Sequence, residues 1–320
     1  MRLHIHHHTT YRYDPPVVMA QHLAHLSPQS GHGQRVLEHT LHFQPPPSVQ
    51  RTHADAFGNP TCHFSLAAPH SALAVSAHSV VETDAPGALP PGTPWDTVAE
   101  AFPYRAGAAY NPAAEFVFAS PYVPHHPELA DFALVVFEPG LPLLQATTAL
   151  MTHIHTHMLY ASGSTGVHTT VLEALAQRKG VCQDFAHLMI GCLRSLGLPA
   201  RYVSGYMLTQ PPPGQPRLIG ADASHAWVQV HDPATGWADF DPTNNLCGLG
   251  RPSEAHITLA IGRDFGDVSP LRGVIQGGGT PQLEVAVTVA PPEELGTLQP
   301  NAACTTTEPC TPDLCPPEPA

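Results

Sequence analysis

The amino-acid sequence predicts an α+β protein in which a β-rich first part precedes a core of helices and antiparallel strands. Three observations lead to this prediction. Hydrophobic residues alternate with polar ones before Trp95, which is typical of strands with one buried face. Between Pro142 and Pro199 the hydrophobic residues recur at helical spacing. Strand-like runs then return after Pro199.

The first strands are predicted from this alternation. The run SALAVSAHSVVET places Leu73 and Val75 at alternate positions, and the run RVLEHTLHF places four residues on one face, namely Leu37, His39, Leu41 and Phe43. The stretch from Thr83 to Trp95 is rich in proline and glycine and is a linker candidate. We therefore expect a β-rich N-terminal domain at residues 1–95 and a connecting segment at residues 96–140.

Three helices are predicted in a core that we expect to span residues 141–292. The first follows Pro142 and has an apolar face made of Leu143, Leu144, Thr147, Met151, Ile154 and Met158. The second begins at Thr170, which forms a capping box with Glu173, and is predicted to end at Gly180. The third ends at Gly197, and its apolar face comprises Val181, Phe185, Leu188, Met189, Cys192 and Leu196.

Strands are predicted after the third helix, in the runs ARYVSGYML, SHAWVQVHD, GWADFDPT and LEVAVTV. In the second run apolar residues alternate with His225, Trp227 and Gln229, so we expect one face on the core and the other toward a cleft or solvent. Residues 293–320 are rich in proline and threonine, contain Cys304, Cys310 and Cys315, and are expected to be disordered.

Charge and composition disfavour several classes of partner. The 13 basic and 26 acidic residues give a formal net charge of −13, so we expect neither nucleic acid nor an anionic membrane as a partner. No apolar run approaches the roughly 20 residues of a membrane span, and the N-terminus has no apolar core of signal-peptide type. The seven cysteines form an odd, scattered set, which favours a reducing compartment and a cytoplasmic location.

One cysteine lies in a position that favours reactivity. Cys182 is predicted at the N-terminus of the third helix, where the helix dipole favours a thiolate, the reactive form of cysteine. His225 begins a later strand, and Asp241 lies where an adjacent antiparallel strand would bring it beside His225. In that order the side chains form a nucleophile, a base and an orienting carboxylate. Cys192, on the apolar face of the same helix, is expected to be an inert buried thiol.

Histidine-rich stretches raise a metal site as the main alternative. On a strand His4, His6 and His8 would share one face, and on a helix His153 and His157 lie at i and i+4. Neither a cysteine pair with zinc-finger spacing nor the glutamate of the zincin pattern accompanies them. We interpret both groups as exposed polar faces and expect no metal and no cofactor. An acidic loop of the EF-hand kind is also absent from the sequence.

Three segments together resemble a known family. They are RKGVCQDFAHLMIGCLRSLGLPARYVSGY, DASHAWVQV and GWADFDPTNN, and they resemble the core of bacterial transglutaminase-like proteins, members of the papain-like cysteine enzyme superfamily. The opening HTTYRYDPPV resembles the N-terminal domain that often precedes this core, and GRDFGDVSPLRGVIQGGG resembles its usual C-terminal segment. The resemblance implies a helix that carries Cys182 and packs on an antiparallel sheet. It also implies Cys182 as nucleophile, His225 as general base and acid, and Asp241 as orienting carboxylate.

The resemblance further implies acyl transfer through a thioester. The donor would be a protein or peptide with a Gln side chain or another amide group, and the acceptor an amine or water. Transglutaminase, papain-like cysteine peptidase and amidase or deamidase activities all remain open, and so does a non-catalytic binding module with the same fold. The family uses an upstream side chain to help the Cys182 backbone N–H hold the oxyanion. Tyr160 is the candidate, and an aromatic cap on a helix end is an equally supported interpretation.

Overall fold

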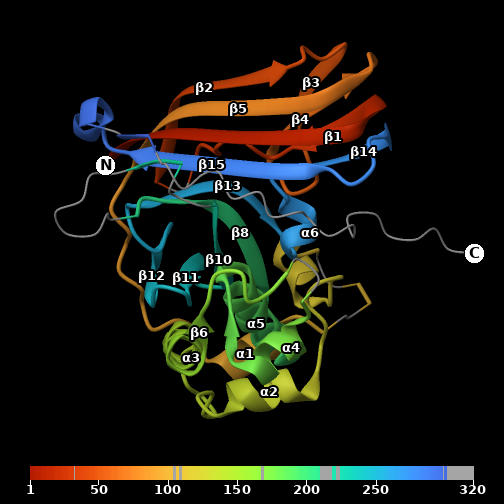
Figure 1. The fold of residues 1–320 in the computed structure, drawn as a ribbon. Helices are drawn as coiled ribbons and strands as arrows, with labels where there is room; N and C mark the ends of the chain where they lie inside the picture. Colours follow the sequence, from red (N-terminus) through yellow and green to blue (C-terminus); the bar gives the residue numbers. More distant parts are fainter. Residues whose placement is uncertain are drawn as a thin grey trace, which may run out of the picture.

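Two antiparallel sheets and a layer of helices form the molecule, as the computed structural model in Figure 1 shows. The structure describes residues 1–31, 33–103, 106–107, 110–166, 169–209, 218–220, 224–297 and 299–300. Asp222, in the DASHAWVQV segment, lies outside these residues, as do the three cysteines after residue 300. Within the described part of the chain no helix is long and apolar enough to cross a membrane.

The first sheet is built around one long strand. Its seven strands are β1 (Arg2–Ala24), β2 (Gln34–Gln44), β3 (Val49–Ala54), β4 (Pro60–Leu66), β5 (His70–Thr83), β14 (Leu271–Gly277) and β15 (Gln282–Ala290). The first half of β1 pairs with β5 on one side and β15 on the other, whereas its second half pairs with β4 and β14. We call this sheet the N-terminal sheet.

The predicted alternation holds in this sheet except at one position. Leu73 and Val75 are buried in its apolar core, and Leu41 and Phe43 pack against the same core. Leu37 was expected on their face but is exposed, because the pairing of β2 with β5 shifts register just before Glu38. Such an extra residue in one strand moves the side chains that precede it to the opposite faces of the sheet.

Two strands assigned to the core by sequence belong to the N-terminal sheet instead. β14 and β15 pair with β1, so the chain returns from the core to the first sheet, and the expected core at residues 141–292 includes two strands of that sheet. A strand pattern predicts a strand but does not say which edge it joins. A 3-10 helix, Pro292–Thr297, and the strand β16 (Gln299–Pro300), which pairs with β9 (Leu218–Ile219), occupy the start of the segment expected to be disordered.

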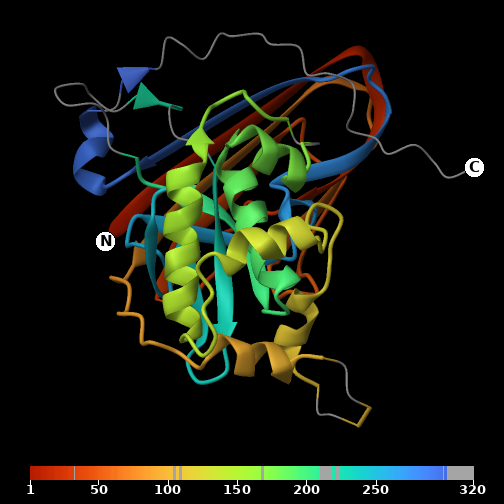
Figure 2. The same ribbon diagram turned by 90° about the horizontal axis from the view of Figure 1, so that it is seen from below.

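The second sheet has five strands in the order β12-β11-β10-β8-β13. They are β8 (Ala200–Met207), β10 (Ser224–Asp232), β11 (Gly236–Asp241), β12 (Leu246–Leu249) and β13 (His256–Gly262). The helices cover the side of this core sheet that faces away from the N-terminal sheet (Figures 1 and 2). They are α1 (Trp95–Ala101), α2 (Pro127–Leu134), α3 (Leu143–His157), α4 (Val171–Gln177) and α5 (Cys182–Ser195); a 3-10 helix spans Pro112–Val117, and α6 (Phe265–Val268) follows β13.

The predicted helices are present, and one of them ends earlier than expected. The capping box of α4 forms, because Thr170 Oγ1 accepts the Glu173 N–H at 3.3 Å and Glu173 accepts the Thr170 N–H at 2.9 Å. The helix ends at Arg178, whose φ is 55°, and Gly180 instead belongs to the short strand β7 (Lys179–Gly180). The end of α5 at Gly197, with φ of 79°, is as predicted.

β10 is buried on both faces, so the expectation that one face meets a cleft or solvent is wrong. Ala226, Val228 and Val230 belong to the main core under the helices. On the opposite face Trp227 is fully buried and packs with Val203 and Ile261. The alternation of polar and apolar residues is misleading here because the N-terminal sheet lies over this side of the core sheet (Figure 1).

Candidate active site

The N-terminus of α5 presents Cys182 at the edge of the core. Cys182 is the first residue of the helix and its side chain is half-buried. The buried carboxylate of Asp184 holds the preceding chain, since its Oδ2 accepts the Val181 N–H at 2.8 Å and the Thr165 hydroxyl at 2.7 Å. Gly180 makes this approach possible, because a Cβ there would lie 2.6 Å from the Asp184 Cβ. Gly180 therefore permits the close approach of Asp184 and does not end α4.

Tyr160 lies beside the chain that leads to Cys182. The strand β6 (Leu159–Tyr160) pairs in parallel with β7, which sets Tyr160 opposite Gly180. The Tyr160 side chain is 51% exposed, and its ring centroid is 6.5 Å from that of Phe185. This position next to the N-terminus of α5 is compatible with the expected oxyanion donor, and that role stays a prediction.

His225 links the thiol to a carboxylate. It opens β10, is 8% exposed, and its Nε2 lies 2.8 Å from Asp241 Oδ2. Because Nε2 is engaged there, Nδ1 is the nitrogen left to interact with Cys182, which acts on the His225 ring. Burial disfavours the imidazolium, but the hydrogen bonds and negative charges of Asp241 and Cys182 outweigh burial and raise the pKa of His225 to about 10.

Asp241 is buried completely and accepts five hydrogen bonds. The antiparallel pairing of β10 with β11, expected from the sequence, brings it beside His225. Its Oδ2 accepts from His225, from the Asn244 amide at 2.7 Å and from His256 Nε2 at 3.0 Å. Its Oδ1 accepts the N–H groups of Thr243 and Asn244. Burial alone would raise the pKa of the Asp241 carboxyl, but the two imidazoles outweigh it and hold that pKa well below its usual range.

Sequence reasoning missed two members of this cluster. Asn244 stands in the segment GWADFDPTNN, but an exposed asparagine in a turn carries no chemical signal of its own. His256 begins β13 and is one of 23 histidines in the chain. Only the strand order of the folded sheet brings it to Asp241.

Other polar residues near the core have structural contacts. Trp227 donates its indole N–H to Asp239 at 2.9 Å, and the Arg201 guanidinium lies 3.8 Å from the centroid of the Trp237 ring, which packs against the main core. Arg263 pairs with Asp267 at 2.8 Å, as expected of a structural ion pair. All four cysteines within the described residues are free, and burial raises the pKa of the fully buried Cys192 thiol.

Potential metal ligands gather at one place within the described residues. His225, Asp241 and His256 offer ligand atoms within 4.8 Å of one another, and the same atoms are the partners of the 2.8 Å and 3.0 Å hydrogen bonds described above. The His153 and His157 rings lie 4.1 Å apart on the exposed side of α3. The expectation that the protein has no resident metal stays a prediction.

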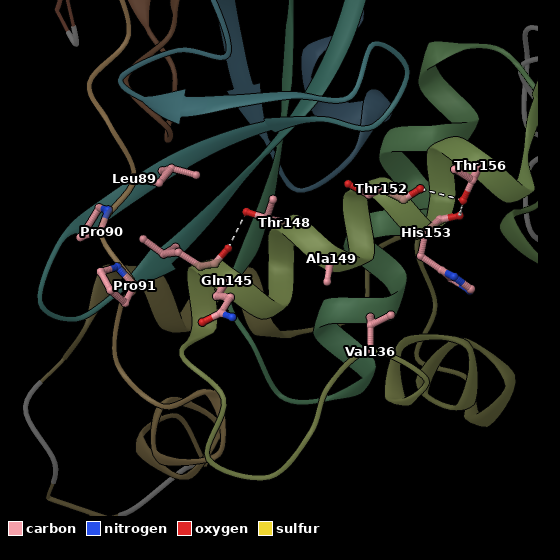
Figure 3. A pocket seen from close by; sticks show the side chains of 11 residues that line it. Leu89, Pro90, Pro91, Val136, Gln145, Thr148, Ala149, Thr152, His153 and Thr156 are labelled. Atoms are coloured by element: carbon pink, nitrogen blue, oxygen red, sulfur yellow. Dashed lines mark hydrogen bonds between the residues drawn. The ribbon is translucent and has the colours of Figure 1, made fainter.

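A pocket of about 720 Å³ is lined by other residues (Figure 3). It is formed by linker residues such as Leu89 and Pro91 and by the outer side of α3, where Thr148 and Thr152 line it. Its lining includes none of the three residues singled out by sequence. The cluster of Cys182, His225 and Asp241 is therefore the candidate active site on chemical grounds.

Known proteins are similar to this chain over most of its length. Residues 3–82 match the bacterial transglutaminase-like N-terminal region, and residues 135–242 match the transglutaminase-like superfamily. An uncharacterized protein of Mycobacterium tuberculosis (strain ATCC 25618 / H37Rv) is 37% identical over 307 residues, which cover 91% of this chain and 93% of the relative. A protein-glutamine gamma-glutamyltransferase of Pseudomonas aeruginosa is 37% identical over 84 residues, 26% of this chain and 12% of that protein.

A solved structure has the same fold. The crystal structure of a candidate cysteine protease from Cytophaga hutchinsonii matches with a TM-score of 0.69 at 21% identity, over 91% of this chain and 90% of the other. The chain therefore belongs to the transglutaminase-like superfamily, a family of cysteine enzymes with a papain-like fold. The family resemblance and the α+β fold class predicted from the sequence are confirmed.

Proposed function

We propose that this protein is a transglutaminase-like thiol acyltransferase that acts on carboxamides through a thioester on Cys182. His225 serves as general base and acid, and Asp241 orients it. The observation that supports this most directly is the placement of His225 between Cys182, which acts on its ring, and the buried Asp241, which its Nε2 approaches at 2.8 Å. The substrate is a protein or peptide that presents a Gln side chain or another amide group, and the acceptor is a primary amine or water.

The reaction proceeds in two acyl-transfer steps. The Cys182 thiolate attacks the carboxamide carbon, and the carbonyl oxygen becomes an oxyanion that the backbone N–H of Cys182 at the start of α5 can bind. The C–N bond breaks, the leaving amine takes the proton of His225, and a thioester remains. An acceptor amine or water then gives a proton to His225 and attacks the thioester carbon. The C–S bond breaks, and the thiolate–imidazolium pair is restored.

The electrostatics of His225 suit this alternation of roles. In the resting enzyme Asp241 and Cys182 together keep the imidazole protonated at neutral pH, so a proton is ready for the leaving amine. In the thioester the sulfur no longer carries charge, and one of the two groups that raise the pKa of His225 is removed. The imidazole can then accept a proton from the incoming amine or water.

The test is incubation of the full chain with a Gln-containing peptide library, with and without a primary amine, followed by mass spectrometry. A mass gain that matches the amine means transamidation, conversion of Gln to Glu means deamidation, and peptide fragments mean peptidase activity. We expect Cys182→Ala to abolish all three products and Cys192→Ala, on the same helix, to retain them. Activity in Cys182→Ala would refute the proposed mechanism.

A non-catalytic binding module is distinguished by the reactivity of the thiol itself. Iodoacetamide at mildly acidic pH labels thiolates, so an activated Cys182 reacts much faster than the other six cysteines. Equal labelling of Cys182 and the remaining thiols, with no product from the library, would favour the binding module. The free thiols of the described cysteines support our further proposal of a reducing, cytoplasmic compartment.

A further inference from the structure

A second histidine contacts the carboxylate of Asp241. His256 is 1% exposed, and its Nε2 lies 3.0 Å from Asp241 Oδ2, the same oxygen that His225 approaches at 2.8 Å. The hydrogen bonds that begin at His225 therefore continue through Asp241 to His256. The proposed acyl-transfer steps do not use this buried imidazole.

The hydrogen bonds of His256 define which nitrogen carries its proton. On the far side of the ring Nδ1 lies 2.8 Å from Ser253 Oγ. The Ser253 oxygen already accepts the Ala255 N–H at 3.3 Å, which leaves the hydroxyl proton free to be donated to Nδ1. Burial lowers the pKa of His256, so the ring is neutral and has one N–H. That N–H is on Nε2 and points at Asp241.

The core sheet is shaped so that His256 can reach Asp241. β13 lies beyond β8 in the strand order, so a side chain from β13 has to cross β8 and β10 to reach β11. Gly205 of β8 sits at this crossing, paired with His225 on one side and Thr258 on the other. A Cβ at Gly205 would lie 2.1 Å from the Ile257 carbonyl oxygen and 2.6 Å from the Trp227 ring. The absent side chain leaves room for the Trp227 ring, whose centroid lies 5.2 Å from that of the His256 ring.

The N-terminal domain holds β13 in place. Within the part of the chain that the structure describes, the outer edge of β13 pairs with no further strand of its sheet, but two buried amide side chains bind its backbone in both directions. Gln34 donates to the Thr258 carbonyl at 2.9 Å and accepts the Thr258 N–H at 2.8 Å. Asn59 does the same at Ile261, at 2.8 Å and 2.7 Å. These contacts give the strand that carries His256 a fixed position relative to the N-terminal sheet.

We propose that His256, oriented by Ser253 and by the N-terminal domain, is a positioning residue that keeps the Asp241 carboxylate ionised and directed at His225. The catalytic consequence rests on the proposed function, whereas the effect on His225 does not. His256 touches neither the thiol nor the acyl group. It acts by donating one hydrogen bond to the Asp241 carboxylate, which is buried and has no access to water.

The ionisation of this site depends on the groups that face it. His225 from β10, Asp241 from β11 and Arg251 from the turn before β13 act on His256. Cys182 from α5 acts on this site through His225. Tyr206 from β8 also titrates, but its hydroxyl is engaged in a hydrogen bond with His7. A donor to a carboxylate favours its charged form. Loss of the His256 donor therefore raises the pKa of Asp241 and leaves this carboxylate with one fewer contact that fixes it beside His225.

The experiment compares the full-length protein with His256→Gln, His256→Leu and His187→Leu. The Gln amide can reproduce the Nε2–H donor, and Leu cannot. His187 is a buried histidine of α5 that accepts the Phe265 N–H and does not touch Asp241, so its variant controls for loss of a buried ring. The rate of iodoacetamide labelling at Cys182 is followed against pH by peptide mass spectrometry. In parallel, proton NMR follows the downfield imidazole N–H resonance of His225.

We expect His256→Leu to slow labelling about tenfold, because the Asp241 carboxylate is no longer fixed beside His225. Its His225 N–H resonance should shift or broaden, and His256→Gln should restore both readouts. A His256→Leu profile like that of the wild type, an equal loss in His256→Gln, or an equal loss in His187→Leu would overturn the proposal. If His256→Leu does not fold, Ser253→Ala should slow labelling to a smaller extent, and an unchanged profile there would overturn it.

The two proposals fail in different ways. If Cys182 in the wild type is no more reactive than the other thiols, the proposed function fails, and the His225 resonance in the same variants still decides the role of His256. If Cys182 is reactive and neither readout responds to His256→Leu, the role of His256 fails and the proposed function is unaffected.

Discussion

Two aspartates of β11 differ in ionisation although they are equally buried. Asp239 and Asp241 lie two residues apart on one strand, and at most 1% of either residue is exposed. Asp241 accepts five hydrogen bonds, two of them from imidazoles. Asp239 accepts two, from the Trp227 indole and the Gln229 amide, both at Oδ1, and its Oδ2 has no hydrogen-bond partner among the described residues.

The consequence is an opposite shift of two carboxyl pKa values. Burial raises the pKa of Asp239 to about 6, because the neutral donors at Oδ1 and the positive charges of Arg201 and Arg251 do not outweigh it. The pKa of Asp241 is instead held below its usual range. The number and charge of the donors, and not the depth of burial, therefore decide which carboxylate stays ionised. The ionised one is next to the histidine that faces the thiol.

Replacement of Asp241 should have the largest effect. Asp241→Asn keeps the shape of the side chain but removes the charge that holds the imidazolium and orients it. We expect the Cys182-dependent rate to fall by about 10³–10⁴, as in other nucleophile–histidine–carboxylate sites. Asp239→Asn is the matched control and should stay within a few-fold of the wild type. Equal losses in the two variants would mean that the strand, and not the Asp241 charge, controls the rate.

The ionisation of Asp239 should appear in the pH dependence of stability. Its pKa is about 6 in the folded protein and about 4 in the unfolded chain, so only the folded state binds the proton between those values. The free energy of unfolding should therefore fall as pH rises from about 4 to about 6, by roughly 2–3 kcal/mol from this group. Urea unfolding of the wild type and Asp239→Asn at several pH values measures the difference. A difference that is independent of pH would contradict the raised pKa.

A third buried acid, Asp184, tests whether the position of a carboxylate affects the reactivity of Cys182. Gly180→Ala would place a Cβ 2.6 Å from the Asp184 Cβ and displace the carboxylate that holds Val181. We expect a loss of about 1–3 kcal/mol in unfolding free energy, typical of overpacking, together with slower labelling of Cys182. Gly166→Ala has no atom within 4 Å of its new Cβ and should change neither measurement. Unchanged labelling in Gly180→Ala would mean that the loop before α5 adapts.

The parts of the site that could be predicted from the sequence are those fixed by local structure. Cys182 could be placed because a helix start is marked by the residues around it, and His225 and Asp241 because strands adjacent in sequence pair as neighbours. Gly180 was misinterpreted because glycine both ends helices and permits close contacts, and only the folded position of Asp184 distinguishes the two uses.

The parts that could not be predicted depend on pairing between distant segments. His256 reaches Asp241 because β13 joins the far edge of β8, and β14 and β15 return to β1 from the other end of the chain. The hydrophobic pattern of β10 predicted a strand but not its second buried face, because that face is covered by a different sheet. Periodicity describes a segment and not the partner that it meets.

Asn244 should give the smallest effect, because water can replace it. Its amide donates to Asp241 Oδ2 at 2.7 Å, but the side chain is exposed, unlike that of His256. We expect Asn244→Ala to lower the Cys182-dependent rate by no more than about tenfold, since a solvent molecule can supply the missing donor. The control is Asn245→Gly, which tolerates the left-handed backbone at φ of 55° and loses only the hydrogen bond with Thr152. A loss as large as that of Asp241→Asn would show that the exposed donor contributes as much as the buried ones, and would remove the distinction drawn between the two aspartates.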